Sequence, residues 1–174
     1  KNLNITPSVT LTIDAKTKKM KSEGIDIISF GVGEPDFQTP ENIKKSAISI
    51  IENGPTGYTD ASGLPQLKKV ICEKLEKENQ LQYKPENIIV SNGAKHSLYN
   101  IFQAISNPGD EVIIPVPYWV SYPELVKMAD AIPVYIECRE ENEFKLKKED
   151  ILSAITDNTK AIILNSPSNP TGSL

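Results

Sequence analysis

The feature that most constrains the fold is a regular alternation of short apolar runs and amphipathic segments between residues 87 and 165. We expect strands at 87–91, 111–115, 132–137 and 160–165, and helices at 94–106, 121–129 and 147–155. Compact turns such as Asn107-Pro108-Gly109-Asp110 keep the connections short. This alternation is typical of an α/β domain in which helices cover a mostly parallel sheet.

The residues before Thr39 are patterned differently. A lysine-rich helix is predicted at 10–22 and a strand-like run at 25–30, followed by a loop rich in glycine and proline. From Thr39 the pattern becomes regular, since Thr39 can cap a helix whose first residue is Pro40. Leu64 and Pro65 open a further helix, with apolar residues from Leu67 onward forming its buried stripe.

Composition excludes several classes of partner. The chain carries 19 Lys and Arg against 23 Asp and Glu, a net charge of −4 with no basic stripe, which argues against nucleic acid and anionic membranes as partners. Cys72 and Cys138 lack metal-ligand or disulfide spacing, so reduced packing residues are expected. No signal peptide opens the chain and no apolar run approaches a membrane span, which makes the cytoplasm the expected location.

Three loops should open at the carboxyl edge of the predicted sheet, where ligands of open α/β sheets bind. The first contains Gly93, Ala94 and Lys95 at the start of a helix, where free N–H groups and the helix dipole favour a phosphate. An Asn-Gly turn without a ligand is the alternative interpretation. His96 is the only histidine, so no histidine-based triad or multi-histidine metal site is predicted.

The second and third loops supply an aromatic ring and an amide. Trp119 follows two prolines and could stack on a flat heteroaromatic ring, although a core position is the usual fate of tryptophan. Asn169 could donate to a ring oxygen, or could serve ordinary turn chemistry. Together the three loops describe a pocket for a phosphorylated aromatic ring. Pyridoxal phosphate fits better than a dinucleotide, because no Gly-x-Gly-x-x-Gly follows a strand.

Six motifs in order carry a resemblance to a known family. They are Gly33-Glu34-Pro35-Asp36-Phe37, Tyr58-Thr59-Asp60-Ala61-Ser62-Gly63-Leu64-Pro65, Gly93-Ala94-Lys95, Asn107-Pro108-Gly109-Asp110-Glu111-Val112, Pro117-Tyr118-Trp119-Val120-Ser121-Tyr122-Pro123 and Asn165-Ser166-Pro167-Ser168-Asn169-Pro170-Thr171-Gly172. The chain resembles the N-terminal half of class I pyridoxal-phosphate-dependent aminotransferases, in particular bacterial-type aspartate aminotransferases. The resemblance implies the fold-type I architecture, a large domain with a mostly parallel mixed sheet. It also implies two parts: 1–38 as an arm and part of the small domain, and 39–174 as the N-terminal part of the cofactor domain.

The resemblance also implies roles for single residues. Gly93, Ala94 and Lys95 would bind the phosphate of pyridoxal 5'-phosphate, Trp119 would lie on its ring, and Asn169 would hydrogen-bond the ring's 3-oxygen. The substrate would meet Trp119 and Asn169 as well, and its α-carboxylate would meet the backbone of Gly33. Tyr58 would reach the cofactor phosphate of the neighbouring subunit in a homodimer.

In the resembled family the lysine that forms the internal aldimine lies beyond the Asn-Pro-Thr-Gly loop. We therefore expect no catalytic residue in this chain, which is read as an incomplete fold, inactive and prone to aggregate when alone. The whole protein is expected to transfer an amino group between an amino acid, aspartate or glutamate first, and a 2-oxo acid. Alternatives are an aromatic or broad-specificity aminotransferase, a prephenate aminotransferase, or a truncated remnant that binds without turnover.

Overall fold

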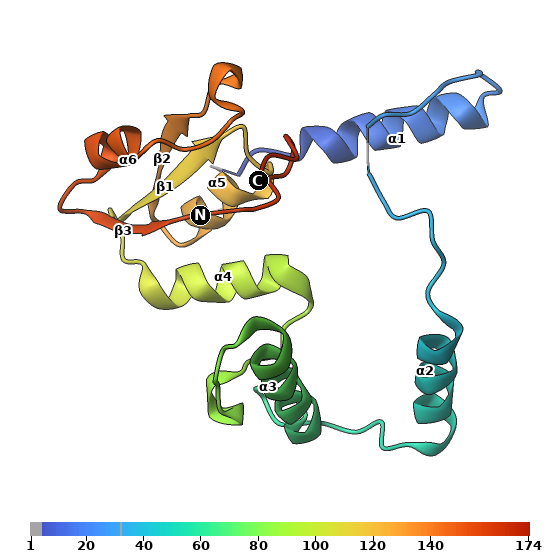
Figure 1. Cartoon of the computed structure of the whole chain (residues 1–174). Helices are drawn as coiled ribbons and strands as arrows, with labels where there is room; N and C mark the ends of the chain where they lie inside the picture. Colours follow the sequence, from blue (N-terminus) through green and yellow to red (C-terminus); the bar gives the residue numbers. More distant parts are fainter. Residues whose placement is uncertain (1–4, 32) are drawn as a thin grey trace. The chain divides into compact units, whose positions relative to one another are not determined.

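The computed structural model describes residues 5–31 and 33–174 (Figure 1). The described helices and strands are α1 (Val9–Ser22), α2 (Glu41–Asn53), α3 (Pro65–Asn79), η2 (Pro85–Asn87), α4 (Gly93–Ile105), β1 (Glu111–Val116), α5 (Ser121–Met128), β2 (Ile132–Glu137), η3 (Glu140–Asn142), α6 (Lys148–Ala154) and β3 (Thr159–Ile162). The described residues form two compact units, one of residues 5–12 and 92–174 and the other of residues 13–31 and 33–91. The predicted division between residues 38 and 39 concerns the domains of the whole protein and stays a prediction.

The first unit is built on a parallel sheet in the order β2-β1-β3. The central strand β1 is rich in Val and Ile, and Val112, Ile113 and Ile114 are almost completely buried. Such a continuous apolar run is typical of a parallel strand that is covered on both faces. The prediction of a parallel α/β sheet is confirmed for these strands, and β2 has the predicted bounds.

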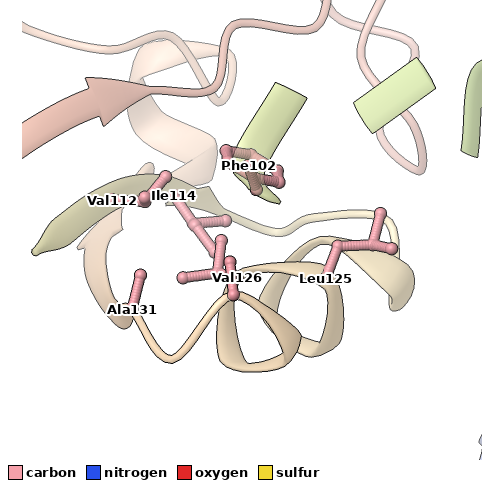
Figure 2. Packing of buried hydrophobic residues seen from close by; sticks show 7 residues of the cluster. Phe102, Val112, Ile114, Leu125, Val126 and Ala131 are labelled. Carbon is pink, nitrogen blue, oxygen red and sulfur yellow. The ribbon is translucent and has the colours of Figure 1, made fainter. Parts of the chain in front are cut away.

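One face of the sheet packs against α4 and α5. The buried cluster there consists of Phe102, Val112, Ile114, Leu125, Val126, Ala129 and Ala131. Figure 2 shows Ile114 of β1 and Val126 of α5 facing one another. Because side chains alternate along a strand, Ile113 points to the opposite face. This core fixes β1 and α5, and so positions the loop between them.

Two of the expected strands are absent from the described residues. The run at 25–30 has no strand, and Ile28 and Phe30 are exposed. The run at 87–91 begins in η2, and the N–H of Val90 donates to the carbonyl oxygen of Ser62 at 2.9 Å. Both predictions are wrong for the same reason, since an apolar run becomes a strand only beside a strand that takes up its hydrogen bonds.

Helix boundaries differ from prediction at one informative place. Helix α2 begins at Glu41, and Pro40 with φ −54° and ψ 142° takes the cap position expected for Thr39. No side chain caps this helix. The start of α3 at Pro65 is confirmed. The prediction that the apolar stripe of α3 is buried is wrong, because Leu67 and Val70 are exposed in the described chain.

The two cysteines differ in burial, since Cys72 is only partly buried and Cys138 is buried. Cys72 and Cys138 are both free thiols, and Cys138 is buried at the end of β2. Burial, together with the charge of Asp150, raises the pKa of the Cys138 thiol, which keeps the sulfur neutral. Among the described residues no helix has the length and apolar character needed to cross a membrane.

Candidate functional site

The parallel pairing of β1 with β3 brings two of the predicted site loops together. Ile113 is paired with Ile162, and the N–H of Ile163 donates to the carbonyl oxygen of Ile113 at 3.0 Å. Because the two strands run in the same direction, the segments that follow Val116 and Ile162 leave the sheet at the same edge. These segments carry Trp119 and Asn169.

The first predicted loop opens α4 as expected. Gly93 has φ +80°, a conformation that favours glycine, and open space surrounds the position where its Cβ would lie. The first N–H groups of a helix lack partners within the helix, so those of α4 can bind an anion. The side chain of Asn92 does not cap this helix. Gly93, Ala94 and Lys95 are exposed.

His96 has a structural role at the same helix start. Its Nδ1 accepts a hydrogen bond of 3.1 Å from the N–H of Asn92. The neutral ring therefore carries its proton on Nε2, and the histidine ties the loop to the first turn of α4. No feature of the sequence distinguished this role from that of an ordinary surface histidine.

Lys95 and Trp119 connect the first loop with the second. The Lys95 Nζ lies 4.9 Å from the centroid of the Trp119 ring. A cation at this distance from an indole is attracted by the ring's negative face. Trp119 is half-buried, and its ring meets that of Tyr122 edge to face, with centroids 5.5 Å apart and planes at 84°. The indole is therefore held in place but is not part of the buried core.

Asn169 lines a cavity at the edge of the sheet. The cavity has a volume of about 280 Å³, and its walls include Pro117, Tyr122, Phe144, Leu164, Asn169 and Thr171. Asn169 is exposed, and no hydrogen bond of its side chain is found among the described residues. Tyr122 also lines this cavity, so Lys95, Trp119, Tyr122 and Asn169 form a series that is linked by two ring contacts and a shared cavity wall.

Gly33 and Tyr58 lie in the second unit. Tyr58 is fully exposed, and open space surrounds the position of a Cβ at Gly33. Beyond Tyr58 the chain turns through Asp60–Gly63, where the N–H of Gly63 donates to the carbonyl oxygen of Asp60 at 2.9 Å. Lys68 steadies the turn, since its Nζ lies 2.9 Å from Ser62 Oγ.

A second aromatic pair, which the sequence did not predict, lies beside the site. The rings of Tyr118 and Tyr135 stack with centroids 5.5 Å apart and planes at 19°. Tyr135 is half-exposed as a residue. Loss of water around its phenol, followed by a hydrogen bond with Tyr118, raises the pKa of Tyr135 to about 12.

An alkaline titration should resolve this tyrosine from the others. The experiment is a rapid pH jump in which tyrosinate absorbance is recorded before the protein unfolds. Tyr135 should ionise near pH 12, whereas an exposed tyrosine ionises at about pH 10. The fold favours the neutral phenol, so this stabilisation is complete below about pH 10 and is lost as the pH rises through 12. Burial also raises the pKa of Tyr122, so Tyr135→Phe should remove the step near pH 12 and leave that of Tyr122. Ionisation of all tyrosines together near pH 10 would contradict the assignment.

Comparison with known proteins agrees with this geometry. The family profile described as "Aminotransferase class I and II" matches residues 25–174. An aspartate aminotransferase from Bacillus sp. strain YM-2 is 60% identical over 97% of this chain, which covers 43% of that relative. A probable aspartate/prephenate aminotransferase from Rickettsia conorii is 52% identical over 97% of this chain and 42% of its own length. The chain thus spans less than half the length of these relatives.

Solved structures give the same result. The structure of the aspartate aminotransferase from Thermus thermophilus with maleate matches with a TM-score of 0.92 at 43% identity. The match covers 95% of this chain and 44% of the Thermus chain. The aspartate aminotransferase from Rhizobium meliloti matches 96% of this chain and 42% of its own, with a TM-score of 0.90 at 47% identity. The predicted fold class is confirmed by these matches.

Proposed function

The chain belongs to the class I and II aminotransferase family, and from this premise we propose that the whole protein is a pyridoxal-phosphate-dependent transaminase. Its reaction would move an amino group between aspartate or glutamate and a 2-oxo acid. The observation that supports this most directly is the series Lys95–Trp119–Tyr122–Asn169 beside the open N-terminus of α4. Relatives named aspartate aminotransferase at 53–60% identity support the choice of substrate.

The donor set at the sheet edge fits pyridoxal phosphate. Gly93, Ala94 and Lys95 would hold the phosphate, because the helix start supplies N–H donors and Lys95 supplies a positive charge. Trp119 would lie against the ring, and the Asn169 amide would donate to the 3-oxygen. When bound, the cofactor supplies an electron sink for the substrate Cα. The contribution of these residues is to bind and orient that ring.

Gly33 and Tyr58, which lie in the second unit, also have roles in the proposed site. The backbone of Gly33 would bind the substrate's α-carboxylate. Tyr58 would reach the cofactor phosphate of the second subunit in a homodimer, and its complete exposure within this chain fits a partner outside it. A cytoplasmic location fits the two free thiols.

A second candidate function is supported by a specific observation. Relatives from Rickettsia conorii and Aquifex aeolicus, at 52% and 48% identity, are named probable aspartate/prephenate aminotransferases. Prephenate is also a 2-oxo acid, so the same cofactor site would serve both reactions. The two functions differ in the amino-group acceptor.

The deciding experiment uses the whole protein reconstituted with pyridoxal phosphate. Aspartate should convert 2-oxoglutarate to glutamate and change the cofactor's absorbance, and a parallel assay should offer prephenate as the acceptor. Faster use of prephenate would favour the second candidate. Absence of amino transfer from aspartate, glutamate and phenylalanine would contradict the proposal and favour a binding remnant.

The proposed role of Trp119 is tested with a variant of this residue, by measuring its affinity for the cofactor. Trp119→Leu should weaken cofactor binding by about 2- to 12-fold, because aromatic stacking contributes about 0.5–1.5 kcal/mol beyond burial. Tyr83→Leu is the matched control, since this half-exposed tyrosine lies in the other unit, outside the series at the sheet edge. If the two variants bound the cofactor equally well, the cofactor ring would not lie against Trp119.

A further inference from the structure

The N-terminal arm, defined here as residues 5–9, is attached to α5 by a contact that joins distant parts of the sequence. The N–H of Thr6 donates to Glu124 Oε2 at 3.0 Å, across a separation of 118 residues. The other carboxylate oxygen, Oε1, lies 3.0 Å from Lys127 Nζ. Both oxygens of Glu124 are therefore engaged, one by the arm and one by its own helix.

Glu124 offers a mostly buried carboxylate to an arm residue, Thr6, that is itself exposed. The Glu124 side chain is only 18% exposed, and that of Lys127 is 30% exposed. Glu124 lies in the first turn of α5, where the helix dipole favours a carboxylate. A hydrogen bond from a backbone N–H to a carboxylate is charge-assisted, and this one is open to solvent on the side of Thr6.

The arm forms one side of a cavity next to the proposed cofactor loops. This cavity has a volume of about 440 Å³. Arm residues from Ile5 to Val9 line it together with Lys95, Tyr118 and residues of α5. Lys95 is the residue whose ammonium lies on the Trp119 ring. The arm and the exposed Lys95 therefore line the same cavity.

We propose that Glu124 is a positioning residue that holds the N-terminal arm on α5 and so maintains the cavity wall beside Lys95. Its effect on the reaction rests on the proposed transaminase function. The arm carries none of the loops that contain Trp119 and Asn169, so its release should change substrate binding more than turnover. We expect a higher KM for the amino acid with little change in kcat.

The attachment itself is tested without any assay of activity, by hydrogen exchange in the whole protein loaded with pyridoxal phosphate. In Glu124→Ala the Thr6 amide should exchange about 5- to 30-fold faster, the loss expected for a charge-assisted hydrogen bond that is partly open to water. Glu124→Gln should lie between this variant and the unmodified protein, because its amide oxygen still accepts. Lys127→Met is the matched control. In this variant the Thr6 amide should exchange at almost the same rate as in the unmodified protein, since the Glu124 carboxylate is still in place.

A second variant removes the donor instead of the acceptor. Thr6→Pro has no N–H at this position and should reproduce the Glu124→Ala result at the other amides of the arm, even where Glu124→Ala folds poorly. Both variants should raise KM by about 3- to 10-fold with kcat within about twofold. Unchanged exchange in both variants would overturn the attachment, and faster exchange with unchanged KM would overturn its role at the cavity. A protein without transaminase activity would refute the proposed function, while the exchange data would still decide the role of Glu124.

Discussion

Ile114→Ala is expected to lower the free energy of unfolding of the whole protein by about 2–5 kcal/mol. Ile114 is 0% exposed and lies in the central strand β1, against Val126 and Phe102 of the buried cluster. Removal of its side chain leaves a cavity that the rigid neighbours cannot fill, so lost transfer energy and lost packing add together. The midpoint of urea unfolding is the direct measurement.

Strand β1 gives this substitution a functional consequence as well. The strand ends at Val116 and leads directly into the loop that carries Trp119. Cofactor binding should therefore be lost over the same range of urea concentration in which the protein unfolds. Ile132→Ala in the neighbouring strand β2 is the control, because Ile132 is 49% exposed and its truncation should cost less than about 1 kcal/mol. Equal losses in the two variants would contradict the placement of the core.

Gly63→Ala is expected to destabilise the protein by a similar amount, for a different reason. Gly63 has φ +107°, and a Cβ there would lie 2.5 Å from Val90 Cγ2 and 2.7 Å from Val90 Cβ. Backbone strain of about 1–2 kcal/mol and overpacking of about 1–3 kcal/mol add to about 2–5 kcal/mol. Thermal unfolding of the whole protein measures the sum as a lower Tm.

The control for this prediction is Gly57→Ala in the same segment. No atom lies within 4 Å of a Cβ at Gly57, so its substitution should change stability by less than about 1 kcal/mol. A combined Gly63→Ala and Val90→Ala variant should recover only part of the loss, because backbone strain remains and the Cβ of residue 90 still lies 2.7 Å from the new Cβ. If Gly63→Ala were as stable as Gly57→Ala, the close approach of the turn to Val90 would be refuted.

The parts of the fold that sequence predicted well are those determined by local pattern. Strand β2 has its predicted bounds, and the turn chemistry of Leu64-Pro65 placed the start of α3 correctly. Periodicity and turn residues act within a few positions, so they can be recognised without a partner. The runs at 25–30 and 87–91 failed because strand formation also needs a neighbour, and Val90 bonds to the turn at Ser62 instead.

The candidate site shows the same division. The sequence pointed to Gly93, Ala94, Lys95, Trp119 and Asn169 through their places after predicted strands. It did not reveal the edge-to-face contact of Tyr122, the stacking of Tyr118 on Tyr135, or the hydrogen bond that His96 accepts from Asn92. These contacts depend on side-chain directions, which strand and helix periods do not specify.

The sequence by itself determined the parallel strands β1, β2 and β3 with the helices between them, the family, and the two loops that leave the sheet after β1 and β3. Those conclusions need only local periodicity and motifs of a few residues. Only the tertiary structure decided that Lys95 lies on Trp119, that Gly63 must approach Val90, and that Glu124 holds Thr6. Each of these contacts joins segments that are distant in sequence, and packing of the sheet and helices, which no local pattern encodes, brings them together.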